Sequence, residues 1–208
     1  MKKFDLSLYL VTDSDICRGR DLASLVKSAV KGGVTIVQLR EKEACTADFL
    51  ELAKSLKTVL QEYNVPLIIN DRLDIALAVD ADGVHIGQSD MPYDVARRML
   101  GHDKIIGLSV ESMEDVAAAN KLDVDYIGVS PIFSTPTKTN TKEPFGLDGT
   151  ALAFKNSKHR IVAIGGINAS NIKEVMNTGI EGVAVVSAIL AADDVERAAR
   201  ELVELMKK

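Results

Sequence analysis

Hydroxyl and ammonium groups are concentrated in one segment of the chain, STPTKTNTK at 134–142. Its nine residues include four threonines, one serine and two lysines, and they directly follow the apolar run YIGVSPIF at 126–133. Hydroxyls, backbone N–H groups and lysine side chains that converge can bind a phosphate group. Pro, Asn and Thr also favour ordinary turns, so a solvated loop is the better interpretation of the segment taken alone.

Two carboxylates end successive apolar runs. Asp71 follows PLIIN, and Asp90 follows GVHIGQS. A hard cation such as Mg²⁺ typically takes one or two protein carboxylates and completes its coordination with water and phosphate oxygens. Either aspartate could instead cap a following helix, since DRLDIALA and DMPYDVARRM both look like helix starts. As a pair facing one site, the two aspartates favour magnesium binding over two separate caps.

Cations and glycines supply further candidates for anion binding. Arg40 and Lys42 lie two residues apart on an extended segment, so their side chains point to the same side. Two adjacent cations suggest an anion between them, although a pair of solvated charges remains an alternative, above all for Lys42. Gly165 and Gly166 lead into a helix start, where backbone N–H groups can bind phosphate, although tight connections also need glycine. With Ser187 one run further on, these residues indicate two anion sites.

Eight short β-branched runs position these side chains, and helical spacing fills the intervals between them. The runs are LSLYLVTD (6–13), TIVQLR (35–40), PLIIND (66–71), GVHIGQ (83–88), KIIGLSV (104–110), YIGVSPIF (126–133), RIVAIGG (160–166) and GVAVVSAI (182–189). Helices are predicted over 21–33 and 46–63, with Thr46 as the N-cap of the second, and weaker patterns cover 72–79 and 92–100.

Strands that are apolar on both faces and alternate with helices predict parallel βαβ units. Eight such units can close into a single (β/α)₈ barrel, the TIM-barrel fold of the α/β class. An open doubly wound sheet is the alternative, but eight regular units without a long insertion favour closure. The 208 residues contain no linker or low-complexity segment, so we expect one catalytic domain spanning 1–208.

The polar candidates all follow strands, as do Gln38, Asn70 and Ser109, whereas the starting ends of the strands carry no comparable group. Catalytic groups of such a barrel collect at the C-terminal ends of its strands, so this sorting favours the anion-binding interpretation of 134–142. No nucleophile–base pair is evident, and His85 is interpreted as a hydrogen-bonded barrel histidine. Charge and hydrogen bonds without a general base suit a reaction in which phosphate or pyrophosphate leaves.

The composition argues against several classes of partner. A net charge of −5, 4% aromatic residues and no tryptophan disfavour nucleic-acid binding. No apolar stretch reaches the roughly 20 residues that a membrane helix needs, and the N-terminal run lacks the pattern of a signal peptide. Cys17 and Cys45 show no metal-ligand spacing and are predicted to be free thiols rather than a disulfide. We therefore expect a cytoplasmic protein with small-molecule ligands.

Eight motifs occur in the order and spacing of a known family: YLVTD (9–13), VQLREK (37–42), IIND (68–71), GVHIGQSD (83–90), GLSV (107–110), GVSPIFSTPTKT (128–139), AIGGI (163–167) and VAVVSAI (183–189). They resemble the thiamine phosphate synthase family, and the resemblance covers nearly the whole chain. QLREK together with TPTK is its most specific part. Ser130 is a departure, because the family more often has glycine before PIF.

The resemblance implies a transferase of thiamine biosynthesis. Such an enzyme condenses hydroxymethylpyrimidine diphosphate with carboxylated hydroxyethylthiazole phosphate and yields thiamine phosphate, pyrophosphate and CO₂. By motif, the pyrimidine diphosphate would contact Gln38, Leu39, Arg40, Glu41, Lys42, Asn70, Ser109 and Lys138, of which Arg40, Lys42, Ser109 and Lys138 would serve catalysis. The thiazole phosphate would contact Thr135, Pro136, Thr137, Gly166, Val186 and Ser187, and Mg²⁺ would be bound by Asp71 and Asp90.

Two other functions would share much of this pattern. A thiazole tautomerase of the same barrel lineage rearranges the thiazole without pyrimidine diphosphate, and it would not need Arg40, Lys42, Lys138 and both aspartates together. A catalytically silent barrel that senses thiazole phosphate or thiamine phosphate would keep the same ligand residues. The sequence leaves the oligomeric state open, and a homo-oligomer is compatible with it.

Overall fold

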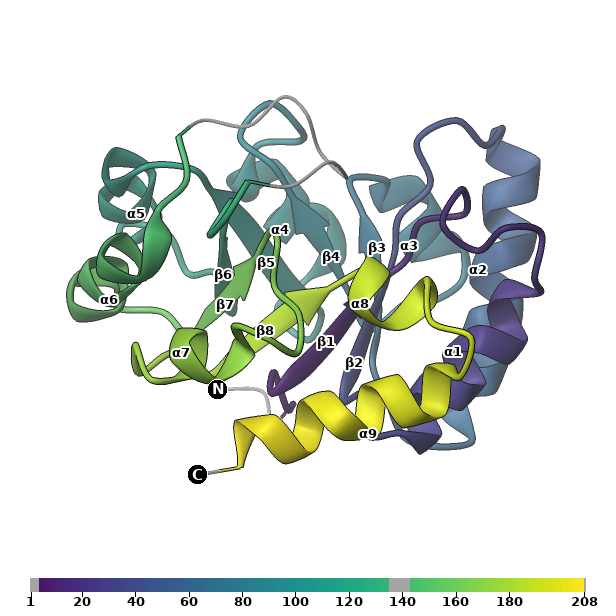
Figure 1. The fold of residues 1–208 in the computed structure, drawn as a ribbon. Coiled ribbons are helices and arrows are strands. Elements are labelled where there is room, and N and C mark those ends of the chain that lie inside the picture. The colour runs from purple at the N-terminus through teal and green to yellow at the C-terminus, as the bar shows by residue number, and fades with distance from the viewer. Residues whose placement is uncertain (1–3, 135–142, 208) are drawn as a thin grey trace.

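Eight parallel strands form a closed barrel with helices packed around it, as Figure 1 shows. The computed structural model describes residues 4–134 and 143–207 of the chain. Its strands are β1 (Leu8–Val11), β2 (Ile36–Leu39), β3 (Leu67–Asn70), β4 (Gly83–Ile86), β5 (Ile105–Val110), β6 (Tyr126–Val129), β7 (Ile161–Ile164) and β8 (Gly182–Val185). Each strand pairs with the next along the chain, and β8 pairs with β1, which closes the barrel.

Helices follow the strands around the outside of the barrel. They are α1 (Leu22–Lys31), α2 (Thr46–Gln61), α3 (Leu73–Ala78), α4 (Tyr93–Leu100), α5 (Met113–Ala119), α6 (Gly146–Asn156), α7 (Ile172–Met176), α8 (Ser187–Leu190) and α9 (Val195–Met206). Within the described ranges, none of these helices has both the length and the apolar character needed to cross a lipid bilayer.

The predicted (β/α)₈ barrel is confirmed over an open sheet, and each of the eight predicted runs contains a strand. Two local predictions are wrong. Cys45, not Thr46, occupies the N-cap of α2, and the Thr46 hydroxyl instead accepts a hydrogen bond from Arg72. The run 182–189 was predicted as one strand, but β8 ends at Val185 and Ser187 begins α8. In a short apolar run, the pattern of side chains alone cannot distinguish the first turn of a helix from the end of a strand.

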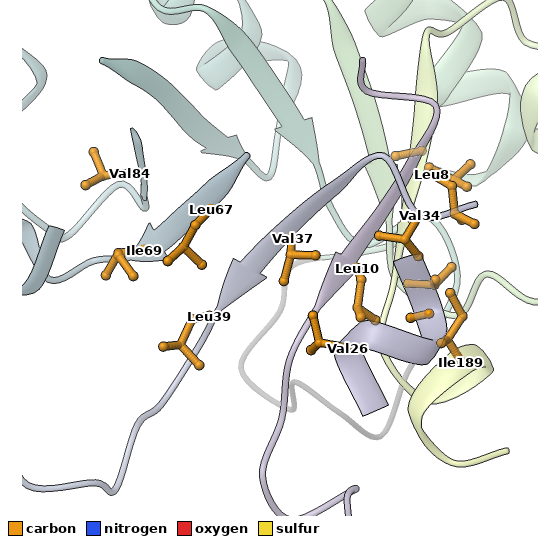
Figure 2. Close-up of a cluster of buried hydrophobic side chains, with 14 of the residues drawn as sticks. Leu8, Leu10, Val26, Val34, Val37, Leu39, Leu67, Ile69, Val84 and Ile189 are labelled. Carbon is orange, nitrogen blue, oxygen red and sulfur yellow. The ribbon is translucent and has the colours of Figure 1, made fainter. Parts of the chain in front are cut away.

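Alternation along the strands divides the apolar side chains into two layers. On β1, Leu8 and Leu10 point outward and pack between the strands and the helices, together with Val37 and Leu39 of β2 (Figure 2). Tyr9 on the same strand points into the barrel. Both faces of the strands are therefore buried, as expected for a parallel barrel.

A side-chain acceptor directly precedes every even-numbered strand. In each case it accepts the backbone N–H of the preceding odd-numbered strand, in the pairs Leu8 N–Thr35 Oγ1 (3.2 Å), Leu67 N–Asp82 Oδ2 (2.9 Å), Ile106 N–Asp125 Oδ2 (2.9 Å) and Ile161 N–Glu181 Oε2 (2.6 Å). The backbone N–H of the same acceptor residue bonds back to the carbonyl of its partner. We call these four residues the rim acceptors. They satisfy strand N–H groups that would otherwise lack a partner at the barrel's N-terminal end.

The rim acceptors correct one expectation. The starting ends of the strands were predicted to carry no group of polar residues comparable to that at the C-terminal ends, yet Thr35, Asp82, Asp125 and Glu181 form such a group there. Two of them also bind cations, since Lys57 lies 2.9 Å from Asp82 and Arg97 lies 2.9 Å from Asp125. Because their partners are backbone amides and basic side chains of the barrel itself, these polar residues serve stability, as is usual at this end of such a barrel.

Candidate active site

A cavity of about 650 Å³ opens at the C-terminal ends of the strands and reaches into the barrel. It brings together eight of the residues singled out in the sequence: Gln38, Arg40, Lys42, Asn70, Ser109, Gly166, Val186 and Ser187. The first five belong to β2, β3 and β5 or follow them, and the last three follow β7 and β8. Side chains from position 38 to position 187 thus share one cavity.

Four other predicted site residues within the described ranges do not line this cavity: Leu39, Glu41, Asp71 and Asp90. Leu39 is fully buried in the layer between strands and helices, so only its backbone could reach a ligand. The Glu41 carboxylate accepts a hydrogen bond from the Ser14 hydroxyl, and burial raises its pKa. Thr135, Pro136, Thr137 and Lys138 lie outside the described residues.

Lys42, Asp71 and Asp90 form a charged cluster beside the cavity. Lys42 Nζ lies 2.5 Å from Asp71 Oδ2. Burial raises the pKa of the Asp90 carboxyl, and a hydrogen bond with the Asp71 carboxyl raises it further. The Asp71 backbone adopts φ 58°, a left-handed conformation that costs a residue other than glycine about 1–2 kcal/mol. Such strain is typical of functional positions.

Neither aspartate caps a helix. The N-caps of α3 and α4 are Arg72 and Pro92, and neither helix start has a side-chain cap. Asp90 Oδ2 instead accepts the Gly87 N–H at 2.7 Å. The alternative that Asp71 and Asp90 cap these helices is therefore wrong.

Two adjacent carboxylates fit the donor set that Mg²⁺ takes from proteins when phosphate oxygens complete its coordination. Burial raises the pKa of Asp90 and the neighbouring Asp71 carboxyl raises it further, and a shared cation would favour the ionised form of Asp90. Over residues 4–134 and 143–207, no group of three or more His, Cys, Asp or Glu side chains could hold a metal by itself. Asp71 and Asp90 thus suit a metal that arrives together with an anionic ligand.

Arg40 is fixed from two sides. Its backbone N–H bonds to Thr12 Oγ1 at 3.0 Å, and its guanidinium nitrogen Nη1 lies 3.5 Å from Asp13 Oδ2. Thr12, Asp13 and Arg40 all line the cavity, and Arg40 remains partly exposed there. A half-buried guanidinium in a cavity wall can bind phosphate oxygens through two parallel N–H groups.

Gly165 and Gly166 occupy the turn after β7 with φ values of 110° and 68°. A Cβ on Gly165 would lie 2.9 Å from Pro131 Cα, and one on Gly166 would lie 2.9 Å from Phe133 Cβ. Only glycine meets both the conformation and the space, so the backbone here comes close to the segment after β6. Gly166 and Ser187 both line the cavity, and they follow β7 and β8, which lie three and two strands from β2 around the closed barrel.

A chain of hydrogen bonds crosses the floor of the cavity. Its members are Gln38 Nε2–Tyr9 OH (2.9 Å), Tyr9 OH–Tyr126 OH (2.8 Å), Tyr126 OH–His85 Nδ1 (2.9 Å) and His85 Nε2–Ser109 Oγ (2.9 Å). Burial raises the pKa of both tyrosines well above the usual value, so their hydroxyls stay neutral. We call these five residues the floor chain.

Glycines make room for the rings of the floor chain. A Cβ on Gly107 would lie 2.1 Å from Tyr126 Cζ, and one on Gly128 would lie 3.1 Å from His85 Cε1. The strand β5 therefore needs glycine opposite the tyrosine ring. This space is built into the barrel rather than left by chance packing.

The floor chain confirms one prediction, since His85 is hydrogen-bonded inside the barrel. It also places His85 Nε2 2.9 Å from Ser109 Oγ, a contact that the sequence did not reveal. Tyr9 and Tyr126 were missed altogether. The signal that could have found them is a polar-tipped ring at an inward position of an apolar strand, in line with Gln38 and His85.

Comparisons with known proteins agree with this site. A family model described as thiamine monophosphate synthase matches residues 8–189. The chain is 52% identical to a thiamine-phosphate synthase of Syntrophomonas wolfei over the whole length of both chains. It is 53% identical to a thiamine-phosphate synthase of Vibrio campbellii, over 96% of this chain and 98% of that one.

A solved structure is also similar. Thiamine phosphate pyrophosphorylase from Pyrococcus furiosus superposes with a TM-score of 0.88 at 39% identity, over 97% of this chain and 96% of the other. The family match and the relatives extend over nearly the entire barrel and include every strand that lines the cavity. The chain therefore belongs to the thiamine phosphate synthase family.

Proposed function

We propose that this chain is a transferase that condenses hydroxymethylpyrimidine diphosphate with hydroxyethylthiazole phosphate to give thiamine phosphate and pyrophosphate. Identity of 52% to a thiamine-phosphate synthase over the whole chain supports the reaction. The observation that carries the proposal is that one cavity collects cations after β2 and glycine-lined backbone after β7. Two phosphorylated molecules can then be bound side by side with their reacting ends together.

The first substrate loses pyrophosphate. The bond from its methylene carbon to oxygen breaks, and the electron pair leaves with the pyrophosphate. Arg40 and Lys42, both in the cavity wall, would neutralise the leaving group, and Lys138 is expected to join them. Removing one such charged donor typically costs a factor of about 10²–10³ in rate.

The carbon left behind carries positive charge, which the aminopyrimidine ring stabilises by donating electron density. Cleavage can therefore run ahead of attack. The thiazole ring nitrogen then donates its lone pair to this carbon and forms the new C–N bond. With a carboxylated thiazole, loss of CO₂ completes the change. Apolar walls that include Val11, Val162 and Ile164 would keep water from trapping the carbon first.

The thiazole phosphate would lie at the other side of the cavity. Backbone N–H groups near Gly166 and Val186 and the Ser187 hydroxyl are the groups available there. Asn171 and Asn168 side chains donate to the Gly166 carbonyl and so fix the turn that presents this backbone. Thr135, Pro136 and Thr137 are proposed to complete the phosphate site.

Asp71 and Asp90 are proposed to hold Mg²⁺, which would add positive charge beside the diphosphate oxygens. In this chain Lys42 bridges the carboxylate cluster and the cavity, since it contacts Asp71 and lines the cavity wall. Its ammonium group can therefore bind either a carboxylate or a phosphate oxygen. Lys42 therefore lies where its ammonium group can exchange the carboxylate for phosphate oxygens as the diphosphate ester becomes free pyrophosphate.

One assay tests the function. Both substrates are incubated with the protein and Mg²⁺, pyrophosphate and thiamine phosphate are measured, and the reaction is repeated with EDTA. Product that requires both substrates and the metal supports the synthase. Rearranged thiazole formed without pyrimidine diphosphate would indicate a tautomerase, and tight binding without turnover would indicate a sensor.

We also propose a cytoplasmic location. Both cysteines are free thiols, one buried and one exposed, which suits a reducing compartment. Fractionation of cells tests this proposal.

A further inference from the structure

All five residues of the floor chain line the cavity, and their hydrogen bonds join Gln38 at one end to Ser109 at the other. Tyr9 and Tyr126 are 1% and 0% exposed, so their hydroxyl protons have no water to bond with. When His85 is neutral, the protons of the chain therefore point along it in one of two directions.

The position of the Gln38 amide nitrogen selects one direction. Nε2 carries only protons and must donate to the Tyr9 hydroxyl. The Tyr9 oxygen then accepts from Gln38, and its own proton goes to Tyr126. The Tyr126 proton goes in turn to His85 Nδ1, which must be the bare nitrogen. His85 then carries its proton on Nε2 and donates it to Ser109.

The opposite direction reverses every role. If the Gln38 oxygen faced Tyr9, each hydroxyl would donate the other way, His85 would carry its proton on Nδ1, and Ser109 would donate to Nε2. Ser109 would then offer the cavity a lone pair, and His85 could act as its base. The tautomer of His85 thus reports the direction of the whole chain.

We propose that the floor chain runs from Gln38 to Ser109, which makes Ser109 a hydrogen-bond donor to the substrate and makes Tyr9, Tyr126 and His85 positioning residues. This inference rests on the proposed function for the identity of the substrate. The Gln38 oxygen then remains for the cavity as an acceptor. An aminopyrimidine diphosphate offers one donor, its exocyclic amino group, while its ring nitrogens and phosphate oxygens are acceptors. An acceptor at Gln38 matches the amino group, and a donor at Ser109 matches a ring nitrogen or a phosphate oxygen.

This direction also settles the Ser109–His85 pair. Nε2 already carries a proton and has no lone pair left to accept one from Ser109. His85 could gain a second proton only at Nδ1, and the Tyr126 proton would then lose its acceptor. His85 is therefore not a base for Ser109, and Ser109 binds the substrate without attacking it.

The first experiment reads the tautomer directly. The protein is labelled with ¹⁵N in its histidines, and two-bond ¹H–¹⁵N correlation spectra are recorded at neutral pH. The chain has three histidines, so the His102→Gln, His159→Gln double variant leaves only the signals of His85. We expect the Nε2–H tautomer as the single form. A dominant Nδ1–H tautomer overturns the proposal.

The second experiment breaks the chain in the middle. Tyr126→Phe keeps the ring that fills the space beside Gly107 but removes the hydroxyl that fixes His85. We expect both His85 tautomers to be populated. Loss of one matched hydrogen bond should raise KM for the pyrimidine diphosphate about tenfold, while KM for the thiazole phosphate stays unchanged. Unchanged kinetics, or an equal rise in both KM values, overturns the positioning role.

Tyr93→Phe is the matched control. The Tyr93 hydroxyl donates to the Asp123 carbonyl outside the cavity, so the same chemical change there should leave His85 and both KM values as they are. Melting temperatures of the two variants separate a loss of fold from a loss of recognition. A single Nε2–H tautomer in a protein without turnover would keep this proposal and reject the proposed function. Normal turnover with the Nδ1–H tautomer would do the reverse.

Discussion

The Lys42 ammonium nitrogen lies 2.5 Å from the Asp71 carboxylate oxygen, although the two residues follow different strands of the barrel. Asp71 in turn contacts the Asp90 carboxyl, whose pKa is raised by burial and by this contact. Three charged groups from the ends of β2, β3 and β4 therefore lie together at the edge of the cavity. In this cluster one ammonium group lies with two carboxyl groups. Binding of a diphosphate together with a metal ion would give each of the three groups a new partner.

Removing Arg40 or Lys138 should abolish most turnover without unfolding the barrel. For Arg40→Ala and for Lys138→Ala we expect kcat/KM to fall by about 10²–10³, because each cation is proposed to neutralise the leaving pyrophosphate. Circular dichroism and thermal melting should match the parent protein closely. Arg200→Ala is the control, since Arg200 lies on α9 and pairs along its own helix with Glu196. Near-normal turnover in both Arg40→Ala and Lys138→Ala would contradict the assignment.

Metal dependence should trace to Asp71. EDTA is expected to stop turnover, and excess Mg²⁺ should restore it. Asp71→Asn keeps the shape of the side chain but removes the charge, so its Mg²⁺ requirement should rise at least tenfold. Titration calorimetry of Mg²⁺ in the presence of pyrophosphate gives a reading that is independent of activity. Asp74→Asn serves as control because Asp74 is exposed and pairs with Arg72. Full activity in EDTA would rule out the metal.

Rim acceptors should affect stability alone. Asp82→Ala leaves the Leu67 N–H and the Lys57 ammonium without their shared partner. We expect the free energy of unfolding to fall by about 1–3 kcal/mol, with kcat/KM unchanged because Asp82 lies at the opposite end of the barrel. Urea unfolding curves measure the first quantity. Asp103→Ala, at an exposed loop position, should change neither. A lowered kcat/KM in Asp82→Ala would show that this end of the barrel does affect the site.

The N-cap of α1 should make stability depend on pH. The Asp21 carboxylate accepts the Ser24 N–H at 2.9 Å, and hydrogen bonds from the Ser24 side chain and backbone lower its pKa. A lowered folded-state pKa means that the cap stabilises above the usual pKa of Asp and is lost as pH falls through the lowered value. Asp21→Ala should therefore cost about 1 kcal/mol at pH 7 and less in acid.

Asp21→Asn separates the cap from the charge. An asparagine side chain can still accept the Ser24 N–H but does not titrate. Its free energy of unfolding should lie near that of the parent at neutral pH and should not decline through this group in acid. Urea unfolding at pH 7 and near pH 3 compares the three proteins. Equal losses for Asp21→Ala at both pH values would mean that the carboxylate charge adds nothing.

The barrel could be predicted from the sequence because strand and helix periods alternate eight times with little interruption. That Gln38, Arg40, Lys42 and Ser109 share a cavity could also be predicted, since inward and outward positions alternate along a strand. The same alternation explains why Leu39 does not reach the cavity. The resemblance assigns all residues of the motif QLREK to the site, but every second side chain of a strand points away from it.

The floor chain could not be predicted because it depends on register between strands that are distant in sequence. Tyr9 and Tyr126 are 117 positions apart, and their contact requires β1 and β6 to face each other across a closed barrel. Nor could the rim acceptors be distinguished from solvated charges. Asp82 and Asp125 look like ordinary loop residues until the amide that each one accepts is placed beside it.

The rim acceptors also divide the barrel into modules. Each one links an odd strand to the even strand that follows, so β1–β2, β3–β4, β5–β6 and β7–β8 are each closed within themselves. A circular permutant opened between two modules, for instance after α2, keeps both partners of every such link on one continuous segment. One opened between α1 and β2 separates Leu8 from Thr35 and should refold more slowly, because the link must then form across nearly the full length of the rearranged chain.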